Sequence, residues 1–513
     1  MALLRSAATV GFYTSISRVL GFVREMLTAN YLGAGFVADA FFVALRLPNL
    51  FRSLFAEGAF NAAFVPLFAG TIAVQGKDEA KRFAEDALAV LVVALFIMVV
   101  AAEIFAPALI HVIAPGFGAE PQKFQLTVNL TRITFPYLLY ISLVSLQGGV
   151  LNSLERFAAV AVTPTLLNIF LIGAMVWFRP VNGYVLAWAV TAAGFAQFTW
   201  LMVSCKQAGM ALSLPWPRLT PEVKSLLRLM GPGTFGAGVT QLNLVVSTAI
   251  ASLLPTGAVA YLNYADRLNQ LPLAMIGIAV GTAILPSLSR QVRTGDEAGA
   301  IATQNRGLEL ALLLTLPAAI ALATLAYPIL ATLFERGAFG PKETAAVTPA
   351  LAAYAAGLPA FVLIKILAPG FFARRDTVTP VKIAVFTMIV NALCTVLLGF
   401  VLPLAHVGIA MATTIAGWVN ALGLGLALHR RGHFALDARA RKTVPRIALA
   451  ALGMGLILIV LERFFAPFLA GDTIHRIIAL IILIASGLGS FALLAFATGA
   501  VDLRTTIRRL KRN

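Results

Sequence analysis

Long apolar stretches recur from one end of this chain to the other, and they constrain its fold more than any other feature. A bilayer core of about 30 Å needs roughly 20 apolar residues per helix, and stretches of that length are separated here by glycine, proline or short charged loops. The mean hydropathy of +0.89 lies far outside the range of soluble domains. The sequence therefore predicts an all-α membrane protein with about 14 transmembrane helices.

The helices are expected at 7–30, 36–72, 85–110, 124–152, 159–178, 183–206, 222–252, 257–289, 302–324, 326–333 with 346–372, 379–402, 407–429, 444–466 and 475–499. The first of them is interrupted by charged residues and is followed by no small-residue cleavage site, so it is interpreted as a mature helix and not as a signal peptide. The segments 36–72 and 257–289 exceed one bilayer crossing, and Pro48 and Pro272 are predicted to bend them.

Lysine and arginine fall on alternate loops, which predicts the orientation of the chain. With the N-terminus inside, most of the 39 basic residues fall on one side, including those in the run 430–446 and the tail 504–512. The few on the opposite side are Lys123, Arg132, Arg179, Arg336, Lys342, Arg463 and Arg476. This asymmetry follows the positive-inside rule and predicts a multi-pass membrane protein with both termini in the cytoplasm. The net charge of +17 is thereby explained by topology and not by nucleic-acid binding.

An internal repeat predicts how the helices are grouped. The run Gly35, Val37, Ala38 is matched by Gly257, Val259, Ala260, and Arg46, Leu47, Leu50 are matched by Arg267, Leu268, Leu271. The repeat predicts a six-helix N-lobe at 1–215 and a six-helix C-lobe at 216–432, with two further helices and a basic cytoplasmic tail at 433–513. Because six is even, both lobes enter the membrane in the same direction, and a central cavity is expected between them, as in rocking transporters. A duplicated bundle that transports nothing is the alternative.

Basic side chains inside the predicted helices carry the functional hypothesis. Those that remain after the loops are subtracted are Arg18, Arg24, Arg46, Arg52, Arg267 and Lys365. Each would cost about 2.5–3.5 kcal/mol at the centre of a lipid-facing helix, so lipid exposure is excluded for most of them. The acids near them, fewer in number, are Glu25, Asp39, Glu57 and Asp266, and Glu25 is expected to pair with Arg18. A surplus of guanidinium groups in a hydrated cavity suits a phosphate. Snorkelling of Arg18, Arg24 and Arg46 to a head-group and a structural role for Lys365 are the alternatives.

The motifs of a membrane enzyme are missing from the sequence. No acidic pair of the DDxxD kind, HExxH helix, glycine-rich phosphate loop or Ser/His/Asp cluster is present. Cys205 and Cys394 lie far apart in apolar segments, so neither a disulfide nor a metal centre is expected. The sequence therefore predicts a protein with no catalytic residues, no bound cofactor and no ATP hydrolysis of its own.

Several strings are long enough to be specific to one family. They are SRVLGFVRE at 17–25, ADAFFVALRLPNLFRSLFAEGAFNAAFVPLF at 38–68, ADRLNQLP at 265–272 and GLPAFVLIKILAPGFFARRDTVTPV at 357–381. These strings resemble the MurJ (MviN) family of lipid II flippases, which belongs to the MOP exporter superfamily. The resemblance runs over nearly the whole chain and is weakest in the last two helices. It implies that undecaprenyl-pyrophosphate-linked peptidoglycan precursor, lipid II, moves from the cytoplasmic to the periplasmic leaflet by alternating access.

The same resemblance implies roles for individual residues. The family's substrate-binding positions correspond to Arg18, Arg24, Arg52, Arg267, Asp39 and Asn49. Secondary candidates for ion pairs are Glu25, Arg46, Glu57, Asp266 and Lys365. The last two helices are expected to form a groove for the polyprenyl tail, which the apolar faces at 447–460 and 477–494 permit.

Two departures from the family pattern bear on the driving force. Gln270 stands where members often have an acid, which weakens the case for an ion pair or a proton role at that position. A weak sodium site, by analogy with some members, would use Asn243, Asn391, Thr395 and Thr414, which offer oxygens without a carboxylate. Because a neutral site binds a cation weakly, the membrane potential is the expected driving force and sodium is the alternative.

Other functions stay open at this point. An exporter of another lipid-linked oligosaccharide in the same superfamily would share the pyrophosphate, whereas an exporter of cationic drugs would need an acidic cavity. A non-transporting scaffold for envelope-building enzymes would not need the arginines within the helices. The expected partners are lipid II, membrane lipids and cell-wall synthesis or division proteins, with no nucleic acid.

Overall fold

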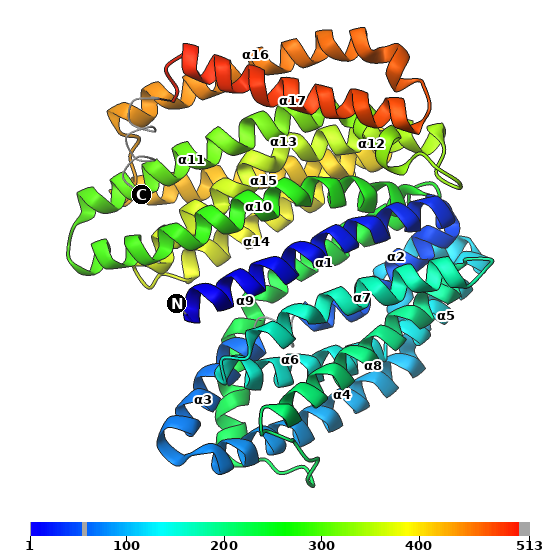
Figure 1. Cartoon of the computed structure of the whole chain (residues 1–513), viewed down its shortest axis with the longest axis vertical. Coiled ribbons are helices and arrows are strands. Elements are labelled where there is room, and N and C mark those ends of the chain that lie inside the picture. The colour runs from blue at the N-terminus through cyan, green and yellow to red at the C-terminus, as the bar shows by residue number, and fades with distance from the viewer. Residues whose placement is uncertain (1, 54–58, 502–513) are drawn as a thin grey trace. The chain divides into compact units, whose positions relative to one another are not determined.

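The computed structural model describes residues 2–53 and 59–501, so Glu57 and the basic tail 504–512 lie outside the described residues. Within that part of the chain the regular structure is helical, apart from one isolated bridge between Arg336 and Phe339 (Figure 1). The helices are α1 (Ala2–Leu32), α2 (Phe36–Phe51), α3 (Ala59–Gln75), α4 (Lys77–Ile113), η2 (Pro115–Ala119), α5 (Pro121–Thr134), α6 (Tyr137–Ser153), α7 (Phe157–Trp177), α8 (Gly183–Gln207), α9 (Pro221–Ser252), α10 (Ala258–Arg293), α11 (Glu297–Thr324), α12 (Ala326–Phe334), α13 (Pro341–Phe372), α14 (Val378–Val396), η3 (Leu397–Val401), α15 (Ala405–Arg430), α16 (Ala438–Leu469) and α17 (Thr473–Ala497).

Ten of the described helical segments are long and apolar enough to cross a bilayer. They are Lys77–Ile113, Pro121–Ser153, Phe157–Trp177, Gly183–Gln207, Glu297–Thr324, Pro341–Phe372, Val378–Val401, Ala405–Arg430, Ala438–Leu469 and Thr473–Ala497. The structure therefore confirms the prediction of an all-helical, multi-pass membrane protein. The full count of about 14 crossings stays a prediction.

One of the predicted helices is divided in two. The range 124–152 contains α5 and α6, which are separated at Phe135 and Pro136. A proline lacks the N–H that would continue the helical hydrogen bonds, which accounts for this break. Proline alone does not decide the matter, because Pro272 lies inside the uninterrupted α10. The range 36–72 contains α2 and α3, and residues 54–58 between them lie outside the described residues.

The described chain packs as two compact units. Unit 1 comprises residues 1–260 with 336–339, and unit 2 comprises residues 261–335 with 340–513. The division falls inside α10 and not at the predicted lobe boundary of 215–216, because α9 packs against α3 and α4 of unit 1. The lobes are defined by a sequence repeat and the units by packing, so the predicted lobe boundaries stay a prediction.

Unit 1 is held together by helix pairs that are distant in sequence. The helix α1 packs along α7, α7 along α8, and α2 along α5. A stack of phenylalanine rings joins α3 to α4, with the Phe64 centroid 5.3 Å from that of Phe68 and 5.5 Å from that of Phe83. These rings are almost fully buried and belong to one apolar cluster of the unit. The packing of α1 on α7 is the contact on which the candidate site depends.

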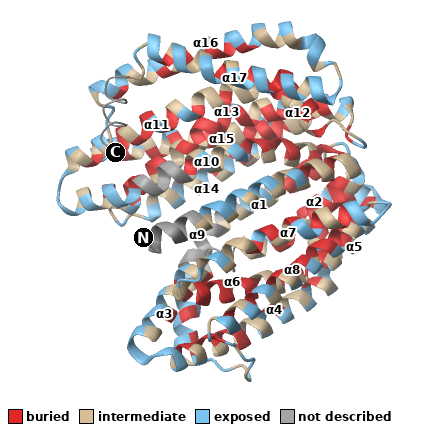
Figure 2. Cartoon of the chain, in the orientation of Figure 1, coloured by how far each residue is buried: buried red, intermediate tan, exposed pale blue. Residues whose placement is uncertain are grey.

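Unit 2 is built around α13. This helix packs against α11 on one side and α15 on the other, and 67% of its most apolar window is buried, compared with 22% for α17. The antiparallel pair α16 and α17 packs on α11 and α12 (Figure 1). Figure 2 shows buried residues concentrated along α13 and α15, whereas α16 and α17 are mostly exposed. Exposed apolar faces of this kind are expected of helices that contact lipid.

Candidate functional site

Arg24 is a basic residue that the structure holds at two points. It lies on α1 with 17% of its side chain exposed, and Asn168 of α7 accepts a hydrogen bond from its Nη1 at 3.0 Å. Its Nη2 donates to Oε1 of Glu25 at 2.5 Å, and the Glu25 side chain is only 4% exposed. The guanidinium has five N–H donors, so three of them have no acceptor among the described residues. An anion with several oxygens is the ligand that such a group fits.

Arg18 lies in a different environment, although it is on the same helix. It is exposed, and no hydrogen bond or ion pair to it occurs among the residues that the structure describes. The expected pairing of Glu25 with Arg18 is wrong in this respect, since the ion pair is formed by Arg24. The reason is geometric: the long Arg24 side chain folds back onto the neighbouring carboxylate.

The end of α2 carries a second basic group. Arg52 is half-buried at the C-terminus of the helix, and its Nε donates to Oδ1 of Asn49 at 3.3 Å. This bond joins two of the predicted substrate-binding residues through one turn of the helix. Arg46, further back on α2, is half-buried as well.

Asp39 is buried and already bonded. Its side chain is 2% exposed, and Lys123 of α5, equally buried, donates to Oδ2 at 2.9 Å. The backbone N–H groups of Gly257 and Ala260 donate to Oδ2 and Oδ1 at 2.7 and 2.8 Å. Gly257 directly precedes α10 and Ala260 lies in its first turn, where the free donors and the helix dipole favour a carboxylate. The sequence predicted Asp39 at the substrate site. In the structure its carboxylate accepts its hydrogen bonds from the protein itself.

The remaining candidates on α10 and α13 belong to unit 2. Asp266 and Arg267 are half-buried on α10, and Gln270 donates to the Asp266 carboxylate one turn away. Lys365 of α13 is exposed, and its stem passes Gly277 of α10 so closely that a Cβ there would lie 2.9 Å from Lys365 Cδ. The glycine therefore leaves the space in which the lysine side chain lies along α10.

The residues of the expected sodium site are polar and mostly inside the protein. Asn391 and Thr395 lie one turn apart on α14 and are 1% and 0% exposed. Thr414 of α15 donates its hydroxyl to the carbonyl of Ala353 at 2.7 Å. Asn243 is half-buried on α9, in the other unit. No group of three or more His, Cys, Asp or Glu side chains suited to a metal ion occurs among the described residues.

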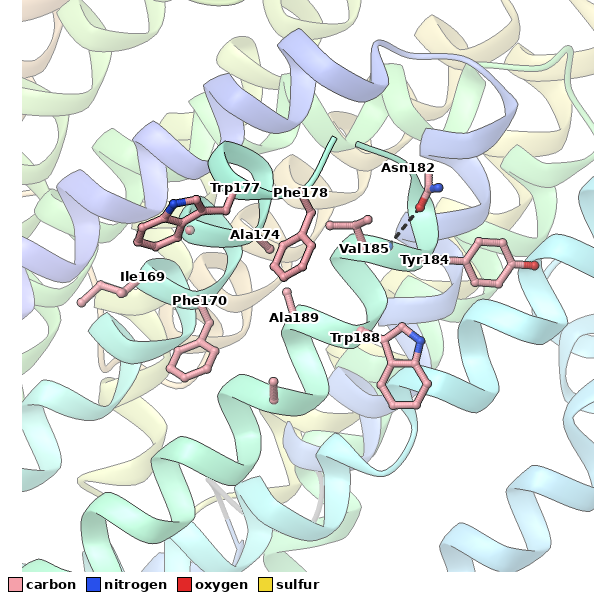
Figure 3. A pocket seen from close by; sticks show the side chains of 12 residues that line it. Ile169, Phe170, Ala174, Trp177, Phe178, Asn182, Tyr184, Val185, Trp188 and Ala189 are labelled. Carbon is pink, nitrogen blue, oxygen red and sulfur yellow. Dashed lines mark hydrogen bonds between the residues drawn. The ribbon is translucent and has the colours of Figure 1, made fainter. Parts of the chain in front are cut away.

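Unit 1 also contains an apolar pocket of about 710 Å³ between α7 and α8 (Figure 3). Aromatic side chains make up much of its wall, among them Phe170, Trp177, Phe178 and Trp188. None of the residues that line it is charged. Such a wall suits hydrocarbon and does not suit a pyrophosphate, so the pocket is not the candidate anion site.

The fold and the basic residues within its helices together define a class, the polytopic helical proteins with the fold of MOP-superfamily transporters. A solved inward-facing structure of a multidrug resistance MATE family transporter of that superfamily matches with a TM-score of 0.66 and 15% identity, over 82% of this chain and 98% of the other. At that identity the likeness shows the fold alone. A solved structure of lipid II flippase MurJ, in an inward closed conformation, matches with a TM-score of 0.79 and 25% identity, over 95% and 99%.

Sequence comparison then identifies the family. The family model described as lipid II flippase MurJ matches residues 28–479. A probable lipid II flippase MurJ from Rhizobium tropici is 44% identical over 524 residues, which cover 100% of this chain and 97% of the relative. The corresponding protein from Rhizobium meliloti (strain 1021) is 45% identical over 521 residues, with the same coverage. The chain belongs to the lipid II flippase MurJ family.

Two residues of the site are missing from the sequence-based prediction. Asn168 is an amide in a strongly apolar helix, which is a visible signal, but nothing in the sequence links it to Arg24. Lys123 is assigned by its sequence position to the loops opposite the cytoplasmic side, whereas its side chain is 2% exposed and paired with Asp39. A lysine at the start of a predicted helix usually reaches water, so its burial requires a partner that only the fold supplies.

Proposed function

We propose that this protein is a flippase that moves lipid II, the undecaprenyl-pyrophosphate-linked peptidoglycan precursor, from the cytoplasmic to the periplasmic leaflet. Membership of the MurJ family supports the proposal. So does the state of Arg24, a half-buried guanidinium that keeps three donors without an acceptor among the described residues. The Arg24 guanidinium is the single structural observation that points to an anionic substrate.

Pyrophosphate is the part of the substrate that these residues recognise. A guanidinium grips phosphate oxygens bidentately, and each charge-assisted hydrogen bond contributes about 1.5–3 kcal/mol. Arg24 binds the pyrophosphate, and Arg18 and Arg52 with Asn49, in the same unit, supply further positive charge. Arg267 adds positive charge on α10 of unit 2. Alternating access then moves the bound head-group from one side of the membrane to the other.

The other charged residues have supporting roles in this proposal. Asp39 holds the start of α10 and does not touch the substrate, because both oxygens of its carboxylate already accept hydrogen bonds from the protein. Glu25 and Asp266 hold neighbouring side chains, Arg24 and Gln270. Arg46 and Lys365 add to the positive field of the helices that carry them.

The topology and energetics complete the proposal. About 14 helices cross the bacterial inner membrane, and both termini are cytoplasmic, as the distribution of basic loops predicts. The two last helices hold the polyprenyl tail. The membrane potential drives transport, since the polar residues Asn391, Thr395 and Thr414 offer sodium no carboxylate. Cell-wall synthesis or division proteins are the expected partners.

A complementation experiment tests the function. The wild-type gene is expected to rescue a strain depleted of its own lipid II flippase, and Arg24→Ala is expected to lose rescue while the protein still accumulates in the membrane. Arg179→Ala is the matched control, because Arg179 is exposed on the α7–α8 loop and donates to the Tyr31 hydroxyl.

A leaflet-specific labelling assay in spheroplasts, which measures how much lipid II lies in each leaflet, identifies the substrate. Depletion should leave lipid II in the cytoplasmic leaflet, and the wild-type protein should restore its outward movement. If another lipid-linked oligosaccharide accumulated instead, the alternative exporter would replace this proposal. Full rescue by Arg24→Ala would remove Arg24 from the binding site.

A further inference from the structure

Asn168 lies where it can determine the orientation of Arg24. It projects from α7 and is 5% exposed, and its Oδ1 accepts from Arg24 Nη1 at 3.0 Å. Its Nδ2 donates to the backbone carbonyl of Ser17 on α1 at 2.9 Å. The amide therefore binds α1 at two points, one on the backbone and one on the guanidinium, and these points are almost two turns apart.

The apolar surroundings of Asn168 explain why both ends of its amide need a hydrogen-bond partner. The helix α7 has a mean hydropathy of 2.0 in its most apolar window, so a buried amide without partners would be costly there. Both ends of this amide are bonded, and both bonds go to the helix that packs along α7. The buried amide oxygen therefore obtains its hydrogen bond from Arg24, and the guanidinium obtains one of its two acceptors from the amide.

Arg24 is thereby held from two sides. Asn168 takes one donor on Nη1, and Glu25 takes one on Nη2, so the plane of the guanidinium is set by two acceptors on different elements. The long arginine side chain would otherwise lose much conformational freedom on binding an anion. Fixing the plane in advance removes part of that cost and leaves the remaining donors aimed at a ligand.

We propose that Asn168 is a positioning residue for anion recognition: it holds the Arg24 guanidinium in the orientation that binds the pyrophosphate of the substrate. The inference rests on the proposed function and adds to it a residue of α7 that does not touch the substrate. It predicts that Asn168 affects binding only through Arg24.

The test measures the binding of undecaprenyl pyrophosphate to the full-length protein in nanodiscs. Asn168→Leu keeps the branching of the asparagine side chain, at a larger volume, and removes both hydrogen bonds. We expect it to weaken binding roughly 10- to 150-fold, the loss that corresponds to one hydrogen bond to a charged group. In the Arg24→Ala background the same substitution should change binding less than about twofold, because the partner is gone.

A buried amide of the same neighbourhood is the control. Gln197 of α8 is 1% exposed and donates to the backbone carbonyl of Thr163 on α7 at 2.9 Å, with no arginine attached. Gln197→Leu should leave the affinity within about twofold of the wild type. If Asn168→Leu did not accumulate, Asn168→Ser would replace it, since its short hydroxyl does not reach the guanidinium and should give the same loss.

The outcomes separate this inference from the function on which it rests. If Arg24→Ala bound the probe as well as the wild type, the binding role of Arg24 itself would be lost. If Arg24→Ala weakened binding and Asn168→Leu did not, only the positioning role would be wrong. An equal loss from Asn168→Leu in both backgrounds, or an equal loss from Gln197→Leu, would reduce Asn168 to a packing residue.

Discussion

At the scale of single residues, the buried ion pair of Asp39 and Lys123 connects several helices near the start of α10. A charge taken out of water is costly unless it is paired and hydrogen-bonded, and both conditions are met here. The ammonium also lies 4.2 Å from the centroid of the Phe117 ring and donates to the Thr256 hydroxyl at 3.2 Å. The pair therefore connects α2 and α5 with the link between α9 and α10.

Removing one partner of this pair should be far worse than removing both. Lys123→Met leaves the Asp39 carboxylate buried without its cation, and we expect a loss of about 3–5 kcal/mol in the free energy of unfolding. The double variant Asp39→Asn with Lys123→Met should recover part of that loss. Thermal unfolding of the purified protein in detergent measures both.

Lys342→Met is the control for this prediction, because Lys342 is exposed in the first turn of α13 and should change stability by less than about 0.5 kcal/mol. A single variant as stable as the control would show that the pair contributes little. A double variant no better than the single one would show that the charge imbalance is not the cause.

At the scale of elements, the chain marks its helix ends more clearly than its helix breaks. Asn182, Asp296, Asp437 and Asp472 each accept a hydrogen bond from the first turn of the helix that follows. Such caps are local. The predicted helix starts at 183 and 475 lie within three residues of their caps, whereas those at 302 and 444 lie six and seven residues after theirs. The break inside the range 124–152 depends on packing as well, which explains why the sequence predicted a continuous helix there.

The turn between α13 and α14 provides a prediction with a pH dependence. Asp376 accepts from the backbone N–H groups of Val378 and Thr379 at 3.1 and 3.0 Å and from Arg431 at 2.5 Å. Hydrogen bonds from Thr379, through its hydroxyl and its backbone N–H, and then from Arg431 hold the pKa of Asp376 below its ordinary value. A depressed carboxyl pKa stabilises the fold above the unfolded pKa of about 4, and this stabilisation is lost as the pH falls through the folded value.

Asp376→Ala should therefore lower the free energy of unfolding by about 1 kcal/mol at neutral pH, the usual cost of losing a capping side chain. The difference from the wild type should persist down to about pH 4 and shrink below it. Thermal unfolding midpoints over a pH series measure the difference. A gap that stayed constant from about pH 7 to about pH 3 would show that the ionised carboxylate is not responsible.

At the scale of the whole molecule, the orientation in the membrane follows from the distribution of charge. Thr294 lies in the exposed connection from α10 to α11, and Thr473 is the exposed first residue of α17. The predicted topology places them on opposite sides of the membrane. In a Cys394→Ser background, Thr473→Cys should react with a membrane-impermeant thiol reagent in intact spheroplasts. Thr294→Cys should react only after permeabilisation.

The native Cys205 is buried, so it should not contribute to the labelling. The unsubstituted background provides the control for that assumption. Labelling of both positions from the same side would contradict the predicted topology, and labelling in the reverse order would place the termini in the periplasm.

Many of the candidate site residues can be predicted from the sequence, because a charged residue in an apolar stretch is easily recognised. Arg24, Arg52 and Arg267 are identified in that way without knowledge of their partners. The sequence did not predict which basic side chains form ion pairs. The sequence suggested Arg18 as the partner of Glu25, whereas side-chain packing selects Arg24.

The amino-acid sequence by itself determined the class of protein and the places where most helices run, since hydrophobic length and helix caps are local properties. Only the tertiary structure decided which polar groups meet inside it. Arg24 and Asn168 are 144 residues apart, and Asp39 and Lys123 are 84 apart. The free energy of such a pair arises when water is excluded from both partners at once, which requires the helices to be packed.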